Sequence, residues 1–295
     1  MIVLAAAASA VSQLSLSPVY GSIPASLLHR RAVNITIVLA FVIGSASGTH
    51  SRVSYERYLP VVASWSQPIQ YLLSKRSSRM GPTYGPLITE ALTCLPLLFI
   101  ATHAVKTYTP ALGPGNSKFI VAESAYAIIS YVTFASVEGS LDALLPRFMG
   151  TSDFFTRSGL QLAVALASSV LSPSSLLFLM IPAILHTVLL NPHHPAARTT
   201  ALLNSTLQSH EYTLLERKES LTGYISVLES AESQFRVLRC DHSLLGGDWL
   251  VTPTRRAQGQ TVREPIYQVF TMLEAVRLVE TGDSPADSEK SALVM

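Results

Sequence analysis

The sequence predicts an α-helical multi-pass membrane bundle of six or seven spans, followed by a small antiparallel β domain with one amphipathic helix. Charged residues make up only 14% of the 295 residues, whereas about a quarter is usual in soluble domains. Residues 1–206 hold 12 of the 21 Lys and Arg and only 6 of the 19 Asp and Glu. Hydrophobic runs fill this first part, so we expect a membrane part followed by a water-facing part.

The apolar segments of the first part are candidate spans, each requiring about 20 residues. No positive residue precedes the first apolar run, which favours a span over a signal peptide. The third segment is interrupted by Pro68, and whether it crosses decides between six and seven spans. The last contains Pro173, and we interpret it as two short helices with a tight turn, one kinked helix being the alternative. The candidate segments are residues 1–20, 33–49, 59–74, 86–105, 119–137 and 159–190.

Lys and Arg counts in the loops predict the orientation of the chain. With either six or seven spans, eight of these residues lie on the side of the C-terminal block and four on the other. The predicted localisation is therefore a multi-pass integral membrane protein with its C-terminal block in the cytosol and the lipid bilayer as a partner. No basic run suits a nucleic-acid backbone, so no nucleic-acid partner is expected.

Three ionisable residues, Glu90, Glu123 and His186, interrupt the apolar runs. Such groups are costly in hydrocarbon and often functional. We favour an interfacial position or a hydrogen bond to a neighbouring helix for the two glutamates, and a proton or substrate path is the alternative. His186 is interpreted as a packing or hydrogen-bonding residue.

Residues 191–211 are predicted to be a linker, because two prolines disfavour continuation of the preceding helix. His193 and His194 have no third ligand nearby, so we expect an exposed polar junction and no metal site. Cys94 and Cys240 fall in different environments, which disfavours a disulfide.

The C-terminal block shows strand patterns followed by a helical pattern. Residues 212–218 and 223–229 are rich in aromatic and β-branched residues and are separated by a short hairpin connection. Residues 235–239 alternate as a half-buried strand does, and Gly246–Gly247 predicts a two-residue turn. Four or five short antiparallel strands are expected.

A helix is expected after these strands. Thr261 and Glu264 have the spacing of a capping box, and Pro265 is tolerated in the first turn. Apolar residues follow at helical spacing up to Val276, and Gly282 can end the helix. We therefore expect the C-terminal domain to be residues 212–282, a small sheet with one helix laid against it.

The segments ERKESLTGYISVLE, FRVLRCDHSLLGGDWL and REPIYQVFTMLEA resemble the N-terminal β domain and connecting helix of spermidine/spermine synthases, the polyamine aminopropyltransferases. More specifically, these segments are similar to fungal members that carry several membrane spans ahead of that domain. The resemblance implies that Tyr267 and Gln268, with Glu264 just before them, border a substrate site. It also implies that residues 283–295 begin a nucleotide-binding domain that is otherwise missing.

The resemblance implies a membrane-anchored aminopropyltransferase-like protein that is inactive as this chain. The family uses decarboxylated S-adenosylmethionine as a substrate. Attack by the amine requires a positioned base, which in the family belongs to the missing domain, so we expect neither a cofactor nor a catalytic residue within the chain. A homo-oligomer through the β domain is an implied partner. Two alternatives are a transporter or channel lined by Glu90 and Glu123, and an interaction protein.

Overall fold

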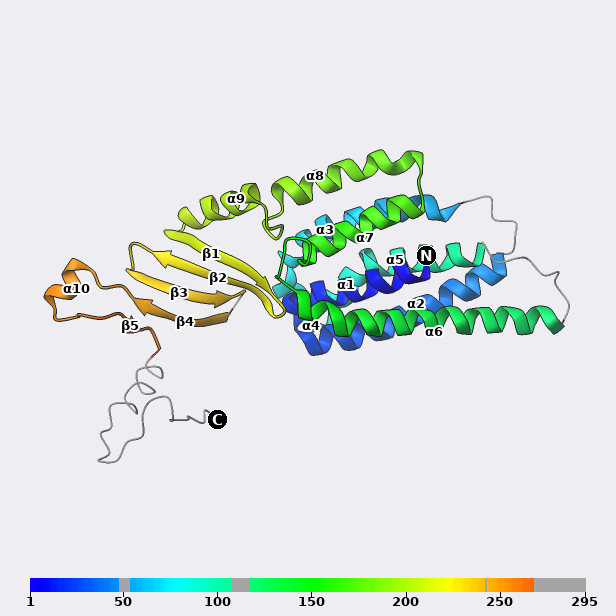
Figure 1. Cartoon of the computed structure of the whole chain (residues 1–295), viewed down its shortest axis with the longest axis horizontal. Coiled ribbons are helices and arrows are strands. Elements are labelled where there is room, and N and C mark those ends of the chain that lie inside the picture. Colours follow the sequence, from blue (N-terminus) through cyan, green and yellow to red (C-terminus); the bar gives the residue numbers. More distant parts are fainter. Residues whose placement is uncertain (48–53, 108–116, 242, 268–295) are drawn as a thin grey trace, which may run out of the picture. The chain divides into compact units, whose positions relative to one another are not determined.

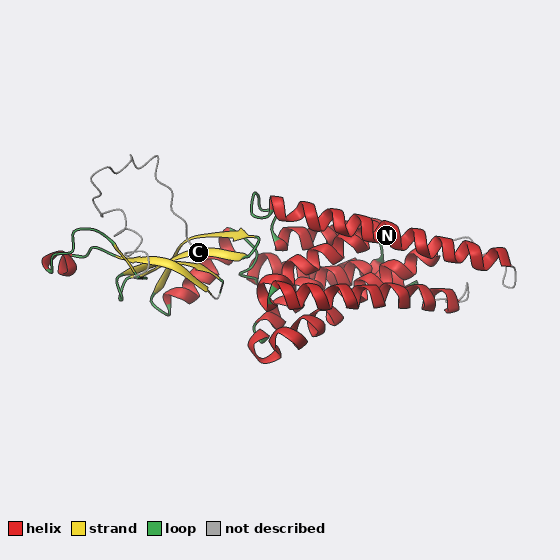
Figure 2. Cartoon of the chain, turned by 90° about the horizontal axis from the view of Figure 1, so that it is seen from below, coloured by secondary structure: helices red, strands yellow, loops and turns green. Residues whose placement is uncertain are grey.

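The computed structural model describes residues 1–47, 54–107, 117–241 and 243–267, in which helices precede a single antiparallel sheet (Figures 1 and 2). The longer helices are α1 (Ile2–Tyr20), α2 (Ser22–Ser47), α3 (Leu59–Ser74), α4 (Ser77–Leu92), α5 (Cys94–Thr107), α6 (Ser117–Phe148), α7 (Arg157–Leu171), α8 (Met180–Leu190) and α9 (Ala197–Gln208). The short helices are η2 (Tyr55–Tyr58), η3 (Ser175–Leu179) and α10 (Pro253–Ala257). The strands are β1 (Tyr212–Ser220), β2 (Gly223–Ser230), β3 (Phe235–Cys240), β4 (Ser243–Trp249) and β5 (Glu264–Pro265).

The chain divides into two compact units. The helical unit comprises Met1–Thr206 together with Lys218–Tyr224, which is the turn between β1 and β2. The sheet unit comprises Leu207–Arg217 and the residues from Ile225 onward. Each unit is described by itself below.

Helix α1 packs against α2, α4, α5, α6 and α7 of the helical unit. It can have this many neighbours because the side chains it buries are small, among them Ala5, Ala6 and Ser9. Small side chains let helix backbones approach closely, and larger ones from the partners fill the remaining space. Phe134 of α6 and Leu98 of α5 are fully buried members of the resulting core.

The break at Pro173 has the form of two short helices, as the sequence predicts. Helix α7 ends at Leu171, and its successor begins as η3 at Ser175 before continuing as α8. Thr156 caps the start of α7 by accepting a hydrogen bond from the Gly159 amide, and Ser174 caps η3 in the same way from Leu176.

The prediction of six or seven spans is wrong. Within the described residues, three helices are long and apolar enough to cross a membrane, or up to four if the bent α4–α5 pair is one span. Helix α3 has 16 residues, α7 has 15 and α8 has 11, and each is shorter than the about 20 residues that a membrane span requires. The predicted multi-pass localisation with a cytosolic C-terminal block depended on that count and is corrected with it.

The sheet has the order β1-β2-β3-β4-β5, and neighbouring strands from β2 to β5 pair antiparallel. The first three strands lie where the sequence predicts them. The predicted turn at Gly246–Gly247 is wrong, because both glycines lie inside β4 and pair with Leu238 and Val237. A Cβ on Gly247 would come 2.4 Å from the Arg236 carbonyl oxygen, so this glycine permits close approach of strands and does not mark a turn.

The predicted capping box at Thr261 and Glu264 is also wrong. Glu264 lies in β5 and pairs with Trp249, because hydrogen bonding to the edge of β4 replaces the first helical turn. The amphipathic helix expected after Pro265 falls mostly on residues 268–295, outside the described part of the chain.

Candidate functional site

A network of polar side chains lies in the interior of the helical unit and joins four helices. His29 of α2 places Nδ1 2.7 Å from Glu90 Oε1 of α4 and Nε2 2.9 Å from Ser9 Oγ of α1. The Ser9 hydroxyl donates to Glu138 Oε1 of α6. His29 and Glu90 are almost completely buried, at 2% and 1% exposure.

Donor and acceptor roles in this network favour a protonated imidazole. The Ser9 hydroxyl donates its hydrogen to Glu138, so the Ser9 oxygen acts as the acceptor for Nε2 of His29. An ionised Glu90 can only accept, so Nδ1 donates as well. A histidine that donates from both nitrogens between two carboxylates is stabilised as the cation.

For Glu90, the structure distinguishes between the alternatives that the sequence left open. Glu90 is not interfacial, but it is hydrogen-bonded to neighbouring helices through His29 and through Ser12 Oγ, which lies 3.1 Å away. Its second oxygen, Oε2, is buried without a hydrogen-bond partner. The side chain of Glu123 lies outside the described part of the chain. His186 packs its ring 5.5 Å from that of Tyr71, in keeping with its predicted packing role.

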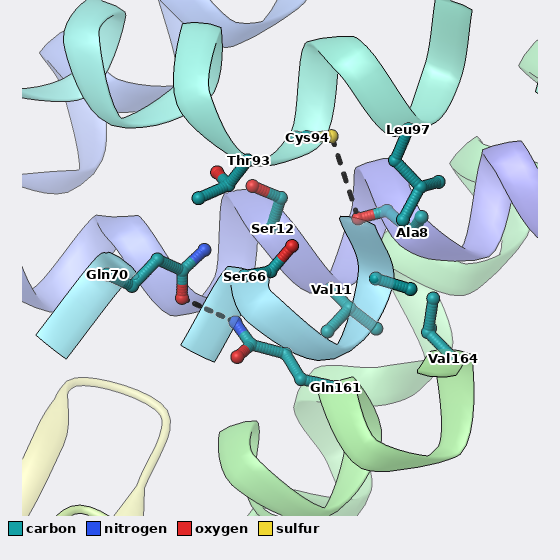
Figure 3. A pocket seen from close by; sticks show the side chains of 11 residues that line it. Ala8, Val11, Ser12, Ser66, Gln70, Thr93, Cys94, Leu97, Gln161 and Val164 are labelled. Atoms are coloured by element: carbon teal, nitrogen blue, oxygen red, sulfur yellow. Dashed lines mark hydrogen bonds between the residues drawn. The ribbon is translucent and has the colours of Figure 1, made fainter. Parts of the chain in front are cut away.

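A small cavity lies beside this network, and Figure 3 shows its lining. Ser12, Thr93 and Cys94 border it, as does Gln161, whose amide donates to Gln70 Oε1 at 2.5 Å. Its volume of about 20 Å³ is enough for one water molecule and too small for a substrate. We therefore interpret the His29 network and this cavity as polar core.

A second cavity in the helical unit is far larger, at about 530 Å³. This volume is within the range of small-molecule and peptide pockets, about 300–1,000 Å³. Of the described residues that line it, Asp142 of α6 is the one that carries a charge. The remaining lining is mixed apolar and uncharged polar: Ala10, Gln13, Leu14, Ser17, Pro18, Ser22, Leu141, Leu145, Pro146, Leu221 and Thr222.

Arg157 fixes two walls of the large cavity. Its Nε donates to the Leu14 carbonyl at 3.0 Å and one terminal nitrogen to the Leu221 carbonyl at 2.8 Å, and both of these residues line the cavity. The other terminal nitrogen lies 2.8 Å from Glu219 Oε1, which also accepts from the Arg157 amide at 2.8 Å. Burial raises the pKa of the Glu219 carboxyl, and the bonds and charge of Arg157 oppose that rise. Sequence reasoning missed this pair, because nothing local relates two residues 62 positions apart.

His193 and His194 lie at a packed junction. His194 Nδ1 is 2.9 Å from Ser158 Oγ, and the His193 ring lies 5.9 Å from the Tyr71 ring and 5.4 Å from the Tyr224 ring. His193 is exposed as predicted, whereas His194 is half-buried. The described residues contain no group of three or more His, Cys, Asp or Glu side chains arranged to hold a metal.

Acidification should destabilise the helical unit through His194. Burial lowers the pKa of His194, with a smaller opposing effect from Asp153. A histidine whose folded pKa lies below its unfolded value contributes stability above about pH 6.5 and loses it as the pH falls below that value. We expect the free energy of unfolding to drop between pH 7.5 and 5.5 by less in His194→Asn than in the unmodified chain. Denaturant titrations at both pH values test this, with His193→Asn as the matched control. Identical pH dependence in all three proteins would contradict the assignment.

Two of the three substrate-binding residues predicted from the family resemblance, Glu264 and Tyr267, lie at the edge of the sheet unit. Glu264 is exposed in β5, and the Tyr267 hydroxyl donates to the Leu244 carbonyl at 3.3 Å. Gln268 lies outside the described residues. No observation tests a binding role for them, so it stays a prediction.

No family model and no solved structure matches the chain. A curated protein of Emericella nidulans, described as an N-terminal histidine N-methyltransferase, is 39% identical over 302 aligned residues. The alignment covers 100% of this chain and 53% of the relative, so the chain spans about half the length of that protein.

This similarity corrects several predictions. The relative is a methyltransferase, so the assignment to spermidine/spermine synthases, and with it polyamine synthesis and the use of decarboxylated S-adenosylmethionine, is wrong. The alternative of a transporter or channel is overturned as well. The expectation that the chain uses no cofactor is wrong too, because a methyltransferase needs a methyl donor. The wrong family assignment has a physical origin, because short antiparallel strands and one amphipathic helix recur in proteins of unrelated function.

Proposed function

We propose that this chain is part of an enzyme that methylates the N-terminal histidine of a protein substrate. The observation that carries the proposal is the 39% identity to the N-terminal histidine N-methyltransferase along the whole of this chain. Because the similarity includes the helical unit and the sheet unit together, it supports a shared role for both and not a single borrowed module.

Methyl transfer to a histidine nitrogen forms an N–C bond from the nitrogen lone pair, breaks the bond between the methyl group and the sulfonium sulfur of the donor, which leaves as a thioether, and releases a proton. The donor implied for such an enzyme is S-adenosylmethionine. Nucleotides of this kind bind at glycine-rich turns where a strand of a parallel sheet leads into a helix. The strand pairings recorded for the described sheet are antiparallel, and its glycine pair lies inside β4, so the described residues do not fit the donor. We assign none of them to it.

The described residues do provide a cavity for the methyl acceptor, which is the N-terminal histidine. The helical unit has a cavity of suitable volume with one carboxylate in its lining and with walls fixed by a buried arginine. An enzyme that acts on a chain terminus has to select a free amino end and exclude internal residues. A cavity closed around a terminal residue can make that selection by size and charge.

The activity is tested with the protein expressed from the complete reading frame that contains this chain. The protein is incubated with S-adenosylmethionine and a peptide that begins with His-Gly, and the peptide mass is followed. We expect the gain of one methyl group on the terminal histidine. Matched peptides carry the same histidine after an added N-terminal alanine, or an acetylated N-terminus, and should gain none. Absence of methylation, or equal methylation of the internal histidine, would overturn the proposal.

A further inference from the structure

We propose that the large cavity between α1, α6 and the β1–β2 turn binds the protonated N-terminal residue of a peptide, with Asp142 as the counter-ion of its ammonium group. The identification of the occupant as a peptide terminus rests on the proposed function. The cavity, its charge and its walls stand independently of it.

The first support is the match between the cavity and a terminal amino-acid residue. Its volume of about 530 Å³ can enclose a residue and part of the next one. Leu14, Leu141 and Leu145 supply apolar surface for a side chain. Gln13 and Thr222 supply hydrogen-bonding groups that can orient a peptide unit. A terminal histidine combines a ring, a peptide bond and a charged amine, and so can use all three kinds of surface.

The second support is the charge of the lining. Asp142 is half-buried, and no hydrogen bond or ion pair is recorded for its side chain within the described part of the chain. Glu138 stands one helical turn earlier on α6, and it is occupied by Ser9. Burial and the charge of Glu138 raise the pKa of Asp142 more than His29 and Arg30 lower it, so its carboxylate lacks a full counter-charge. Among the described residues, no cationic side chain lines the cavity, which therefore favours a cation over an anion.

The third support is preorganisation. The Arg157 guanidinium donates to the carbonyls of Leu14 and Leu221, two residues of the lining, and forms an ion pair with Glu219. Gly150 secures the same turn: its φ is +76°, and a Cβ there would lie 2.0 Å from the Glu219 carbonyl oxygen. Walls that are fixed before the ligand arrives reduce the entropy lost on binding.

The proposal is tested by titrating the purified 295-residue chain with His-Gly-amide and with its Nα-acetylated counterpart, using calorimetry. We expect saturable binding of the free amine and none of the acetylated form. Asp142→Asn should weaken binding about tenfold or more, the usual effect of losing a charge-assisted hydrogen bond. Asp142→Glu should retain most of the affinity. Asp153→Asn is the matched control and should bind as the unmodified chain does, because Asp153 is exposed and outside the lining. Circular dichroism verifies that each variant is folded.

The outcomes separate this proposal from the proposed function. Unchanged affinity in Asp142→Asn, equal binding of the acetylated peptide, or no binding of either peptide would overturn the site. Equal binding of Ala-Gly-amide would support the site for N-terminal amines in general. Methylation by the complete protein with an unchanged KM in Asp142→Asn would overturn the site and leave the function standing. Binding that depends on Asp142 without methylation would support the site and overturn the function.

Discussion

Replacing Arg157 by methionine should lower the free energy of unfolding by about 3–5 kcal/mol, the usual cost of removing one partner of a buried ion pair. The side chains of Arg157 and Glu219 are 8% and 2% exposed. The variant would leave the Glu219 carboxylate buried without a counter-charge. It would also orphan the carbonyls of Leu14, Ser220 and Leu221, which accept from the guanidinium. Denaturant unfolding followed by circular dichroism measures the loss.

The matched control is Arg236→Met in the sheet unit. Arg236 Nη2 lies 2.6 Å from Glu229 Oε2, which is shorter than the 2.8 Å contact between Arg157 and Glu219, but these side chains are 35% and 29% exposed. Partly solvated pairs contribute about 1 kcal/mol or less. The double variant Arg157→Met with Glu219→Leu should recover part of the loss, because it removes the unpaired charge. Equal losses at Arg157 and Arg236 would show that burial does not determine the strength of the first pair.

The second large effect is expected at His29. His29→Leu should destabilise the helical unit by about 3–5 kcal/mol, because the buried Glu90 carboxylate would lose the cation that it contacts and the partly exposed Glu138 would lose the same nearby charge. His29 Nε2 is 3.8 Å from Glu138 Oε1, so both carboxylates are close to its charge. The measurement is again the free energy of unfolding near neutral pH.

Two further variants make this prediction specific. His29→Leu combined with Glu90→Gln should be more stable than His29→Leu alone, since one buried charge is removed with the cation. His210→Ala should change stability by about 0.5 kcal/mol or less, because that side chain is exposed and outside the network. A neutral effect of His29→Leu would mean that the histidine is uncharged in the folded chain.

Several features of the chain follow from local sequence alone. The strands near 212–239 and the helix break at Pro173 lie where alternation and proline predict them, because these signals act within a few residues. The errors arise where context overrides a local signal. Gly246–Gly247 has turn-forming residues, yet a neighbouring strand approaches closely there and both glycines remain in β4. Glu264 has the spacing of a helix cap, yet β4 offers it an edge to pair with.

Family and function were not determined by pattern. The strand and helix segments of the C-terminal block suggested aminopropyltransferases, whereas similarity along the whole chain connects it to a methyltransferase. A short pattern reports the packing requirements of a small sheet, which many functions share, and identity over 302 aligned residues does not arise from those requirements alone.

By itself, the sequence determined the division into an apolar, charge-poor first part and a charged second part, because composition and periodicity are properties of neighbouring residues. Only the tertiary structure decided which charges meet. Ser9 and Glu138 are 129 positions apart, Arg157 and Glu219 are 62 apart, and the cavity beside Asp142 is bounded by α1, α6 and the β1–β2 turn. Such contacts depend on how whole helices pack, and no local pattern encodes that packing.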